Sequence, residues 1–344
     1  MNKNKFLLLI SMVLYVNLHT QIVPSQDSNF QINSSLSDEF DSLDLSKWKI
    51  CDLWDGDCAN WGGNSRFVSS NTIVYNGELS LKVDAPFLNP PYSFQTCCNT
   101  GGIHSLDSNY HYGYYEICAK LPGNYHNGES NGQKFFPAFW TYNQESIEQY
   151  IYIHDEIDIL EPSGHQYSDG KTNVCGWHDE DGNGSHYKVG EDSIKSDTPL
   201  FENYHKYGVE WDTDRIIFYF DDIPFYCTYN HPSLIMRQQY VVIDLQIDES
   251  VYDFNPSITF PQYMKVLYFK YYELKIDSCM QNAFILNNSD LNNFSFGIRQ
   301  NIIIGNGSSS ISLPTGSIKT FRASNEIIIN GDFTVYEGSE LNLI

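Results

Sequence analysis

Four acidic residues lie within the segment IHDEIDILEP, residues 153–162, which otherwise has the apolar character of a buried strand. Its isoleucines and leucine favour a strand, and so short an apolar run fits a strand better than a helix. An ionised carboxylate is costly to bury without a partner, so acids in such a strand indicate a specific role.

The spacing of three of these acids predicts that they share one face of the strand. Side chains two positions apart lie on the same face about 6.5 Å apart, which places Glu156 beside Asp158. Glu161 is five positions beyond Glu156 and would point to the opposite face of a regular strand. A single β-bulge at Ile159 or Leu160 returns Glu161 to the face of the other two. We therefore expect a row of three carboxylates on a bulged strand.

Three aligned carboxylates suit the chemistry of a retaining glycosidase. Such enzymes hold two carboxyl groups about 5–5.5 Å apart, one as the nucleophile and the other as general acid and then base. The middle acid would hold the nucleophile by hydrogen bonding and would favour a protonated acid/base. From the spacing alone, a solvated charged strand face and a calcium site are the alternatives.

Composition narrows the range of partners. The 20 Lys and Arg residues against 43 Asp and Glu residues give a net charge of −23, which repels nucleic acid and anionic membranes and disfavours polyanionic substrates. Aromatic residues make up 15% of the chain and offer rings that can stack on sugars. We expect a polysaccharide as the partner of a monomer, with no nucleic acid.

The first 20 residues have the layout of a secretory signal peptide. Lys3 and Lys5 precede the apolar run FLLLISMVLYV, after which the chain becomes polar. This run is too short to span a bilayer, and we expect a secreted protein with no membrane span. The eight cysteines are an even number, which in an exported chain predicts disulfides, and a local Cys51–Cys58 bridge is the simplest pairing.

The rest of the chain predicts an all-β protein. Short aromatic and β-branched segments alternate with turn signals such as Asn76-Gly77 and Asp221-Asp222, which argues for two stacked antiparallel sheets. Composition shifts after Cys279 to Asn, Ser and Gly with very short β segments. We expect a main domain over residues 21–277 and a small module of short strands over residues 278–344.

Several motifs give the acidic strand a family context. The segment EIDILE, together with GGIHS, YGYYEICAKLP, FPAFW, YHKYGVEW and VLYFKYYEL, resembles glycoside hydrolase family 16 over about residues 36–276. EIDILE is similar to the bulged branch that holds laminarinases, agarases and carrageenases. The resemblance implies a β-jelly-roll sandwich with a concave substrate cleft. It makes Glu156 the nucleophile, Asp158 its helper and Glu161 the acid/base. The tail resembles repeats that end many secreted proteins of Bacteroidetes.

Four further residues are candidates for substrate binding. Trp140 ends the FPAFW segment shortly before the acids, and the resemblance places it in the cleft, the alternative being a core tryptophan. Trp61 and Trp177 lie in polar segments, where they either stack on sugars or cap the sandwich. Relatives carry a histidine one strand after the acids, whereas this chain reads TNVCGWH, so that Cys175 or His178 stands there.

We expect no cofactor. Many relatives carry an aspartate in the closing strand that helps bind a structural calcium, and Leu267 stands in its place here, which argues against calcium at that site. The leading hypothesis is a secreted retaining endo-glycosidase acting on β-1,3- or β-1,3-1,4-glucan. An agarase or other red-algal galactan hydrolase is the alternative with the same catalytic residues. A non-catalytic glycan-binding protein is a third hypothesis, although the chain keeps all three acids.

The basic residues near the acids help to decide between a neutral and a sulfated polysaccharide as substrate. From 130 to 200 they are Lys134, Lys171, Lys188 and Lys195 alone. A sulfated galactan favours a cleft lined with Arg or Lys, because charge-assisted hydrogen bonds recognise sulfate. The sequence therefore argues against carrageenan, but it does not separate glucan from agarose, since both are neutral.

Overall fold

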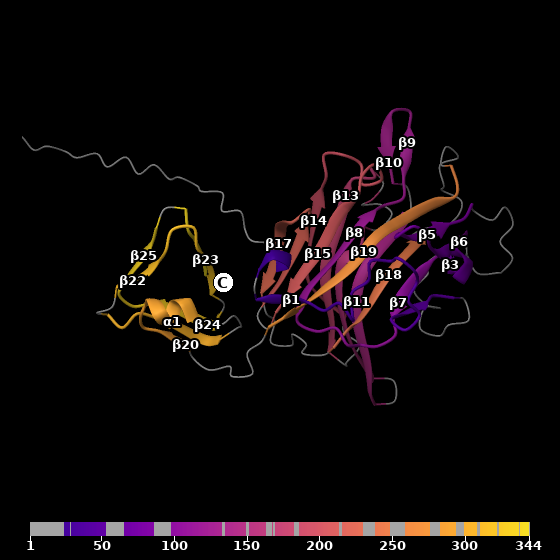
Figure 1. Cartoon of the computed structure of the whole chain (residues 1–344). Helices are drawn as coiled ribbons and strands as arrows, with labels where there is room; N and C mark the ends of the chain where they lie inside the picture. The colour runs from indigo at the N-terminus through magenta and orange to yellow at the C-terminus, as the bar shows by residue number, and fades with distance from the viewer. Residues whose placement is uncertain are drawn as a thin grey trace, which may run out of the picture.

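The computed structural model describes residues 24–343 with gaps, of which the longest are 53–64, 86–97, 230–237, 248–258 and 276–282 (Figure 1). The expected signal peptide over residues 1–20, Cys58, Trp61 and the expected boundary at 277/278 lie outside the described residues. Those expectations therefore stay predictions. No helix in the described part of the chain has the length and apolar character that a membrane crossing requires.

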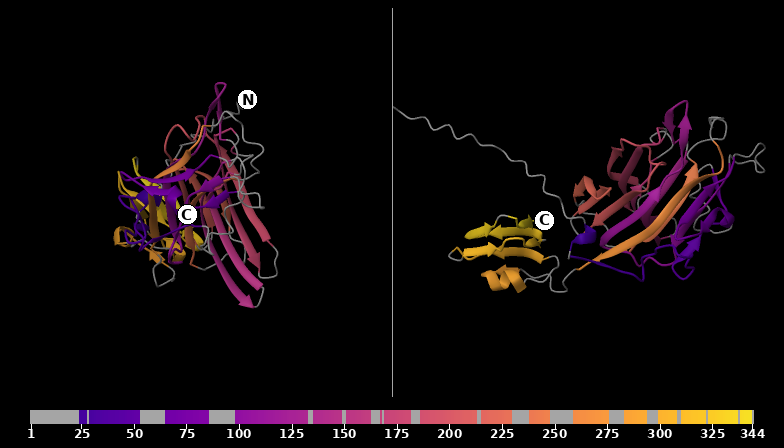
Figure 2. Two further views of the ribbon diagram at one scale, coloured as in Figure 1. Left: turned by 90° about the vertical axis from the view of Figure 1, so that its right-hand side faces the viewer. Right: turned by 45° about the horizontal axis from the view of Figure 1, so that its top comes forward.

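Two large antiparallel sheets form the body of the protein, as the sequence predicted (Figures 1 and 2). The first sheet runs in the order β17 (Ile223–Tyr229), β16 (Arg215–Phe220), β15 (His205–Trp211), β8 (Gly113–Lys120), β19 (Gln262–Leu274), β5 (Leu79–Val83) and β4 (Thr72–Val74), with β1 (Phe30–Ile32) beside β19. The second runs in the order β14 (His186–Lys195), β13 (Thr172–Asp181), β12 (Ile151–Leu160), β11 (Phe135–Glu148), β18 (Tyr240–Ile247), β7 (Gly102–Ser105) and β2 (Trp48–Ile50).

Smaller elements flank the two sheets. They are the antiparallel pair β9 (Asn124–His126) and β10 (Glu129–Asn131), the parallel pair β3 (Ser65–Phe67) and β6 (Cys98–Thr100), and the short 3₁₀ turns Pro24–Gln26 and Ser69–Asn71. The β9–β10 hairpin projects beyond the ends of the sheets (Figure 1). It turns through Asn127 and Gly128, which both have positive φ.

One continuous apolar core lies between the two sheets. Ile117 of β8 and Phe269 of β19 reach it from the first sheet, and Phe139 of β11 and Ile243 of β18 reach it from the second. Alternation along β11 and β18 sends the next residues to the other face, where Ala138, Trp140 and Val242 form a separate small cluster. The second sheet is therefore lined with apolar side chains on both of its faces.

The hairpin predicted at Asn76-Gly77 is confirmed. Strands β4 and β5 pair in antiparallel register, and the turn between them has φ of 53° at Asn76 and 73° at Gly77. Positive φ at both central residues is the geometry that favours Asn-Gly in a two-residue hairpin. Asp221 and Asp222 have positive φ in the same way and join β16 to β17.

The strands from residue 283 onward pair in parallel, unlike those of the sandwich. They are β20 (Ala283–Ile285), β21 (Arg299–Ile304), β22 (Ser310–Leu313), β23 (Ile318–Phe321), β24 (Ala323–Ile329), β25 (Asp332–Val335) and β26 (Glu340–Leu343), with the helix α1 (Asn288–Asn293). Figure 1 shows them as separate short sheets, and Ile302, Ile311 and Phe321 of these strands belong to one small apolar core. The short stacked strands expected from this composition are thus present in the described residues.

Candidate active site

Strand β12 carries the bulge that the sequence predicted. Asp158 pairs with Trp140 of β11, whereas Leu160 pairs with the preceding residue Phe139, so Ile159 is the extra residue. Ile159 and Leu160 are consecutive, yet both belong to the core between the sheets. Because two successive side chains point inward, the alternation shifts by one and Glu161 returns to the outer face. The backbone N–H of Glu161 donates to the Val174 carbonyl at 3.0 Å, which ties this end of the strand to β13.

The bulge brings the three predicted acids together. Glu156, Asp158 and Glu161 each place a carboxylate oxygen within 4.8 Å of the others. Asp158 is 1% exposed, while the two glutamates that flank it are half-buried and accessible from solvent. The same spacing would suit a bound cation, and among the described residues no other group of His, Cys, Asp and Glu comes this close together. Geometry alone therefore identifies a site, which we call the acid face.

A row of aromatic rings lies beside the acids. Trp140 and Tyr142 of β11 are opposite Asp158 and Glu156 of β12 in the strand register. Their ring centroids are 5.2 Å apart, and Tyr142 stacks on Tyr240 of β18 at 5.3 Å. The rings of Trp140, Tyr142 and Tyr240 thus form a row across neighbouring strands. Trp140 is where the sequence analysis placed it, next to the acids, although only 8% of its surface is exposed.

A buried carboxyl, Asp244 of β18, fixes the tryptophan. Its Oδ2 accepts a hydrogen bond from Trp140 Nε1 at 3.0 Å, and its Oδ1 accepts one from Gln246 Nε2 at 2.9 Å. Gly102 of β7 is the register partner of Asp244, and a Cβ at that glycine would lie 2.9 Å from the Asp244 Cβ. Gly102, the second glycine of the GGIHS motif, therefore leaves the space that the Asp244 side chain occupies.

Burial raises the pKa of Asp244 to about 7, although the hydrogen bonds from Trp140 and Gln246 lower it. Between the ordinary value of 3.8 and about 7, the folded protein holds a proton that the unfolded chain has released. The stability that this group contributes is present below about pH 4 and is lost as the pH rises through about 7. Asp244 therefore makes the fold less stable in neutral than in acidic solution.

We predict that Asp244→Asn becomes increasingly more stable than the wild type as the pH rises from 5 to 8. Asparagine keeps an acceptor for the indole but has no charge to bury. The difference in Tm between the two proteins, measured by calorimetry across this range, should grow with pH and level off above about pH 8. Asp41→Asn, at an exposed position, is the matched control and should show no such trend. A pH-independent difference for Asp244→Asn would contradict the prediction.

Two of the remaining predicted binding residues, Trp177 and His178, belong to β13, as does Cys175. Cys175 belongs to the core between the sheets, so it does not stand on the acid face. Burial there raises the pKa of its thiol far above the ordinary range. The backbone of His178 pairs with Glu156, and that of Trp177 pairs with Ile157. Their side chains lie outside the described part of the structure, so substrate binding by Trp177, His178 and Trp61 stays a prediction.

Sequence reasoning missed Asp244, Tyr142 and Tyr240. Asp244 had a readable signal, because the segment VVIDLQI places an acid in an apolar strand as EIDIL does. The two tyrosines had none, since a chain with 25 tyrosines offers many such candidates and only the pairing of β11 with β18 unites these two. Leu267, which the resemblance placed where many relatives carry an aspartate, is the extra residue of a bulge in β19.

Known proteins share this fold. The structure of porphyranase B from Zobellia galactanivorans has 21% sequence identity and a TM-score of 0.54, over 71% of this chain and 92% of that one. The laminarinase catalytic domain from Thermotoga maritima has 20% identity and a TM-score of 0.55, over 71% of this chain and 98% of that one. These similarities support the jelly-roll architecture.

Sequence comparison reaches the same part of the chain. The glucan endo-1,3-beta-glucosidase A1 of Niallia circulans is 27% identical over 223 residues, which are 59% of this chain and 30% of that protein. The chain thus spans less than a third of this relative's length. A family model described as the GH16 domain of beta-porphyranases A–D matches residues 30–267, which include β12 and all three acids. Because this match covers more than half of the chain, the protein belongs to glycoside hydrolase family 16.

Proposed function

We propose that the protein is a secreted, retaining endo-glycosidase that hydrolyses β-linked polysaccharide, with β-1,3- or β-1,3-1,4-glucan as its substrate. The observation that carries the proposal is the separation of at most 4.8 Å between carboxylate oxygens of Glu156, Asp158 and Glu161. Retaining enzymes hold their two carboxyl groups about 5–5.5 Å apart, whereas inverting enzymes leave about 6.5–9.5 Å for a water molecule. The short distance favours the retaining mechanism.

In the first step Glu156 attacks the anomeric carbon while Glu161 gives its proton to the departing glycosidic oxygen. The glycosidic bond breaks and a covalent glycosyl–Glu156 ester forms. In the second step Glu161, now ionised, takes a proton from water as that water attacks the same carbon and releases Glu156. Asp158, buried between the two glutamates, positions Glu156, and its negative charge favours protonation of Glu161 before the first step.

The proposal of a glucan substrate rests on the negative charge of the chain, which favours an uncharged polymer, and on the row of aromatic rings beside the acids. Trp140, Tyr142 and Tyr240 offer apolar ring surface next to the acids, which suits the C–H faces of sugar rings. A chain with a net charge of −23 disfavours a polyanionic polymer. The endo-1,3-glucanase of Niallia circulans adds support for a glucan. Secretion is proposed from the basic and apolar character of the first 20 residues.

A second candidate is a galactan hydrolase with the same catalytic residues. The observation that favours it is the match of residues 30–267 to the beta-porphyranase GH16 domain. The two candidates share the chemistry of the acid face and differ only in which sugar the neighbouring groups accept.

We expect oligosaccharides from laminarin or mixed-linkage glucan when the mature protein is incubated separately with these polymers, agarose, porphyran and κ-carrageenan. Product sizing by chromatography checks this, and a spread of intermediate lengths early in the reaction marks endo cleavage. Products from porphyran or agarose alone would replace the glucan with the galactan. No products from any polymer would leave the non-catalytic glycan-binding hypothesis in place and refute the proposed activity.

A further inference from the structure

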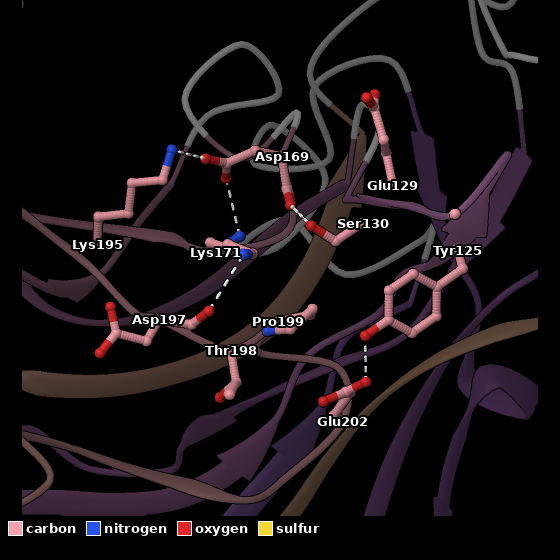
Figure 3. A pocket seen from close by; sticks show the side chains of 11 residues that line it. Tyr125, Glu129, Ser130, Asp169, Lys171, Lys195, Asp197, Thr198, Pro199 and Glu202 are labelled. Atoms are coloured by element: carbon pink, nitrogen blue, oxygen red, sulfur yellow. Dashed lines mark hydrogen bonds and ion pairs between the residues drawn. The ribbon is translucent and has the colours of Figure 1, made fainter.

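A polar cavity lies beyond the start of β13 and the end of β14, and none of the three acids of the acid face lines it. Its volume is about 590 Å³, within the range of about 300–1,000 Å³ that small-molecule sites occupy. Three separate stretches of chain line it, namely the β9–β10 hairpin, residues 169–171 before β13 and residues 195–202, which begin with the last residue of β14 (Figure 3). A second cavity of about 270 Å³ adjoins it and shares Glu129, Ser130 and Asp169.

One wall of the cavity is an exposed tyrosine ring that its neighbours hold in place. Tyr125 is 51% exposed, and its ring meets Phe201 edge-on with centroids 5.4 Å apart. Its hydroxyl donates to a carboxylate oxygen of Glu202, as Figure 3 shows. Because these contacts limit the rotation of the ring, little entropy is lost when a ligand stacks on it.

The opposite wall is a network of fixed polar groups. Lys195 Nζ lies 2.5 Å from Asp169 Oδ2, and Lys171 Nζ donates to the Asp197 carbonyl at 3.1 Å. Ser130 Oγ donates to the Asp169 carbonyl at 2.7 Å (Figure 3). The network joins all three lining stretches, so hydrogen bonds and an ion pair connect the walls of the cavity.

The charges of the residues that line the cavity indicate which kind of ligand it can bind. Four carboxylates, of Glu129, Asp169, Asp197 and Glu202, face two lysines, so the cavity is net negative and disfavours sulfate or phosphate groups. Among the described residues the acids of the cavity do not converge as metal ligands do, because the acid face alone meets that spacing. An apolar ring opposite fixed polar groups instead suits a neutral sugar, which has C–H faces and hydroxyl edges.

The cavity is separate from the acid face but close to it. Val174, which accepts the hydrogen bond from the Glu161 N–H, lies three residues after Lys171, or about 10 Å further along the chain. We propose that this cavity is a secondary binding site for neutral sugar residues of a polysaccharide, an inference that rests on the proposed function for its substrate class. Sugar bound there raises the local concentration of polymer at the acid face.

We expect Tyr125→Ala to weaken retention by laminarin in affinity gel electrophoresis about 5- to 10-fold, the size of one lost ring stack. Thr198→Arg, at an exposed lining position, should weaken it similarly by filling the cavity. Both variants should keep the wild-type Tm and the wild-type kcat/KM on an aryl β-laminaribioside, an oligosaccharide of two sugars that is too short to occupy both sites. Tyr75→Ala, which removes a 72% exposed ring elsewhere, is the matched control and should leave retention unchanged.

Unchanged retention in both cavity variants would overturn the proposal, as would an equal loss of activity on polymer and oligosaccharide, which would indicate a structural role. The gel measures binding without catalysis, so it tests the cavity even if the wild type hydrolyses nothing. Failure of the proposed function would instead appear as an inactive wild type on every polymer of the panel. The two failures are therefore distinguishable.

Discussion

The turnover number of Glu156→Gln on soluble polysaccharide falls by more than about 10³-fold, because the variant cannot form the glycosyl ester on which the mechanism depends. Glutamine has nearly the shape of glutamate but lacks the negative charge that attacks the anomeric carbon. Glu156 is half-buried and its neighbours Ile157 and Ile159 carry the packing, so the fold should survive. The measurement is a reducing-sugar assay with purified protein at saturating substrate.

The control for this variant is Glu39→Gln, which makes the same chemical change far from the acids in sequence. The Glu39 carboxylate lies 3.4 Å from Lys270 Nζ and its side chain is 62% exposed. Exposed ion pairs contribute about 0–1 kcal/mol, so this variant should keep full activity. A Tm within about 4 °C of the wild type, or about 1 kcal/mol, would establish that Glu156→Gln is folded. Near-normal turnover in a folded Glu156→Gln would remove Glu156 from the mechanism.

The acid row was predictable because it depends on local periodicity. The alternation of a strand fixes the relation between Glu156 and Asp158, and the consecutive apolar residues Ile159 and Leu160 both lie in the core. The burial of both residues goes with the bulge at Ile159, and the bulge fixes the direction of Glu161. The information lies within six residues, so one sequence suffices to read it.

The partners of the acid row were not predictable in this way. The indole N–H of Trp140 donates its hydrogen bond to Asp244, which is 104 residues away in the chain. The sequence shows an acid in a second apolar strand but not that β18 lies next to β11, since strand order is a property of the whole fold. Similarly, the cavity beside Tyr125 needs three distant stretches of chain to meet. Long-range pairing, rather than local propensity, sets these features.

The choice between Cys175 and His178 shows the same limit. In the sequence both stand near the position where relatives carry a histidine, and the two lie three residues apart. An odd separation means opposite faces in a regular strand, so the register of β13 against β12 decides between them. That register pairs His178 with Glu156, and Cys175 lies in the core. The thiol is thereby excluded from the acid face.

Glu161→Ala should lose about 10²- to 10⁴-fold in turnover on polysaccharide and should regain activity with azide on an aryl β-glycoside. A phenolate of low pKa leaves without a proton, so the glycosyl–Glu156 ester still forms. This ester then accumulates, because alanine at position 161 cannot act as the base that activates water. Azide needs no base and attacks the ester, so that two inversions give the β-glycosyl azide. Proton NMR of the product distinguishes its anomeric configuration.

The matched variant is Glu156→Ala, in which azide displaces the leaving group directly and a single inversion gives the α-glycosyl azide. The pair of products assigns the two glutamates separately, because each anomer follows from the loss of one role and not of the other. The outcome also tests the distance on which the retaining assignment depends, since Glu156 and Glu161 each place a carboxylate oxygen within 4.8 Å of the other. An α-azide from Glu161→Ala would reverse the roles, and the absence of rescue in both variants would refute the covalent intermediate.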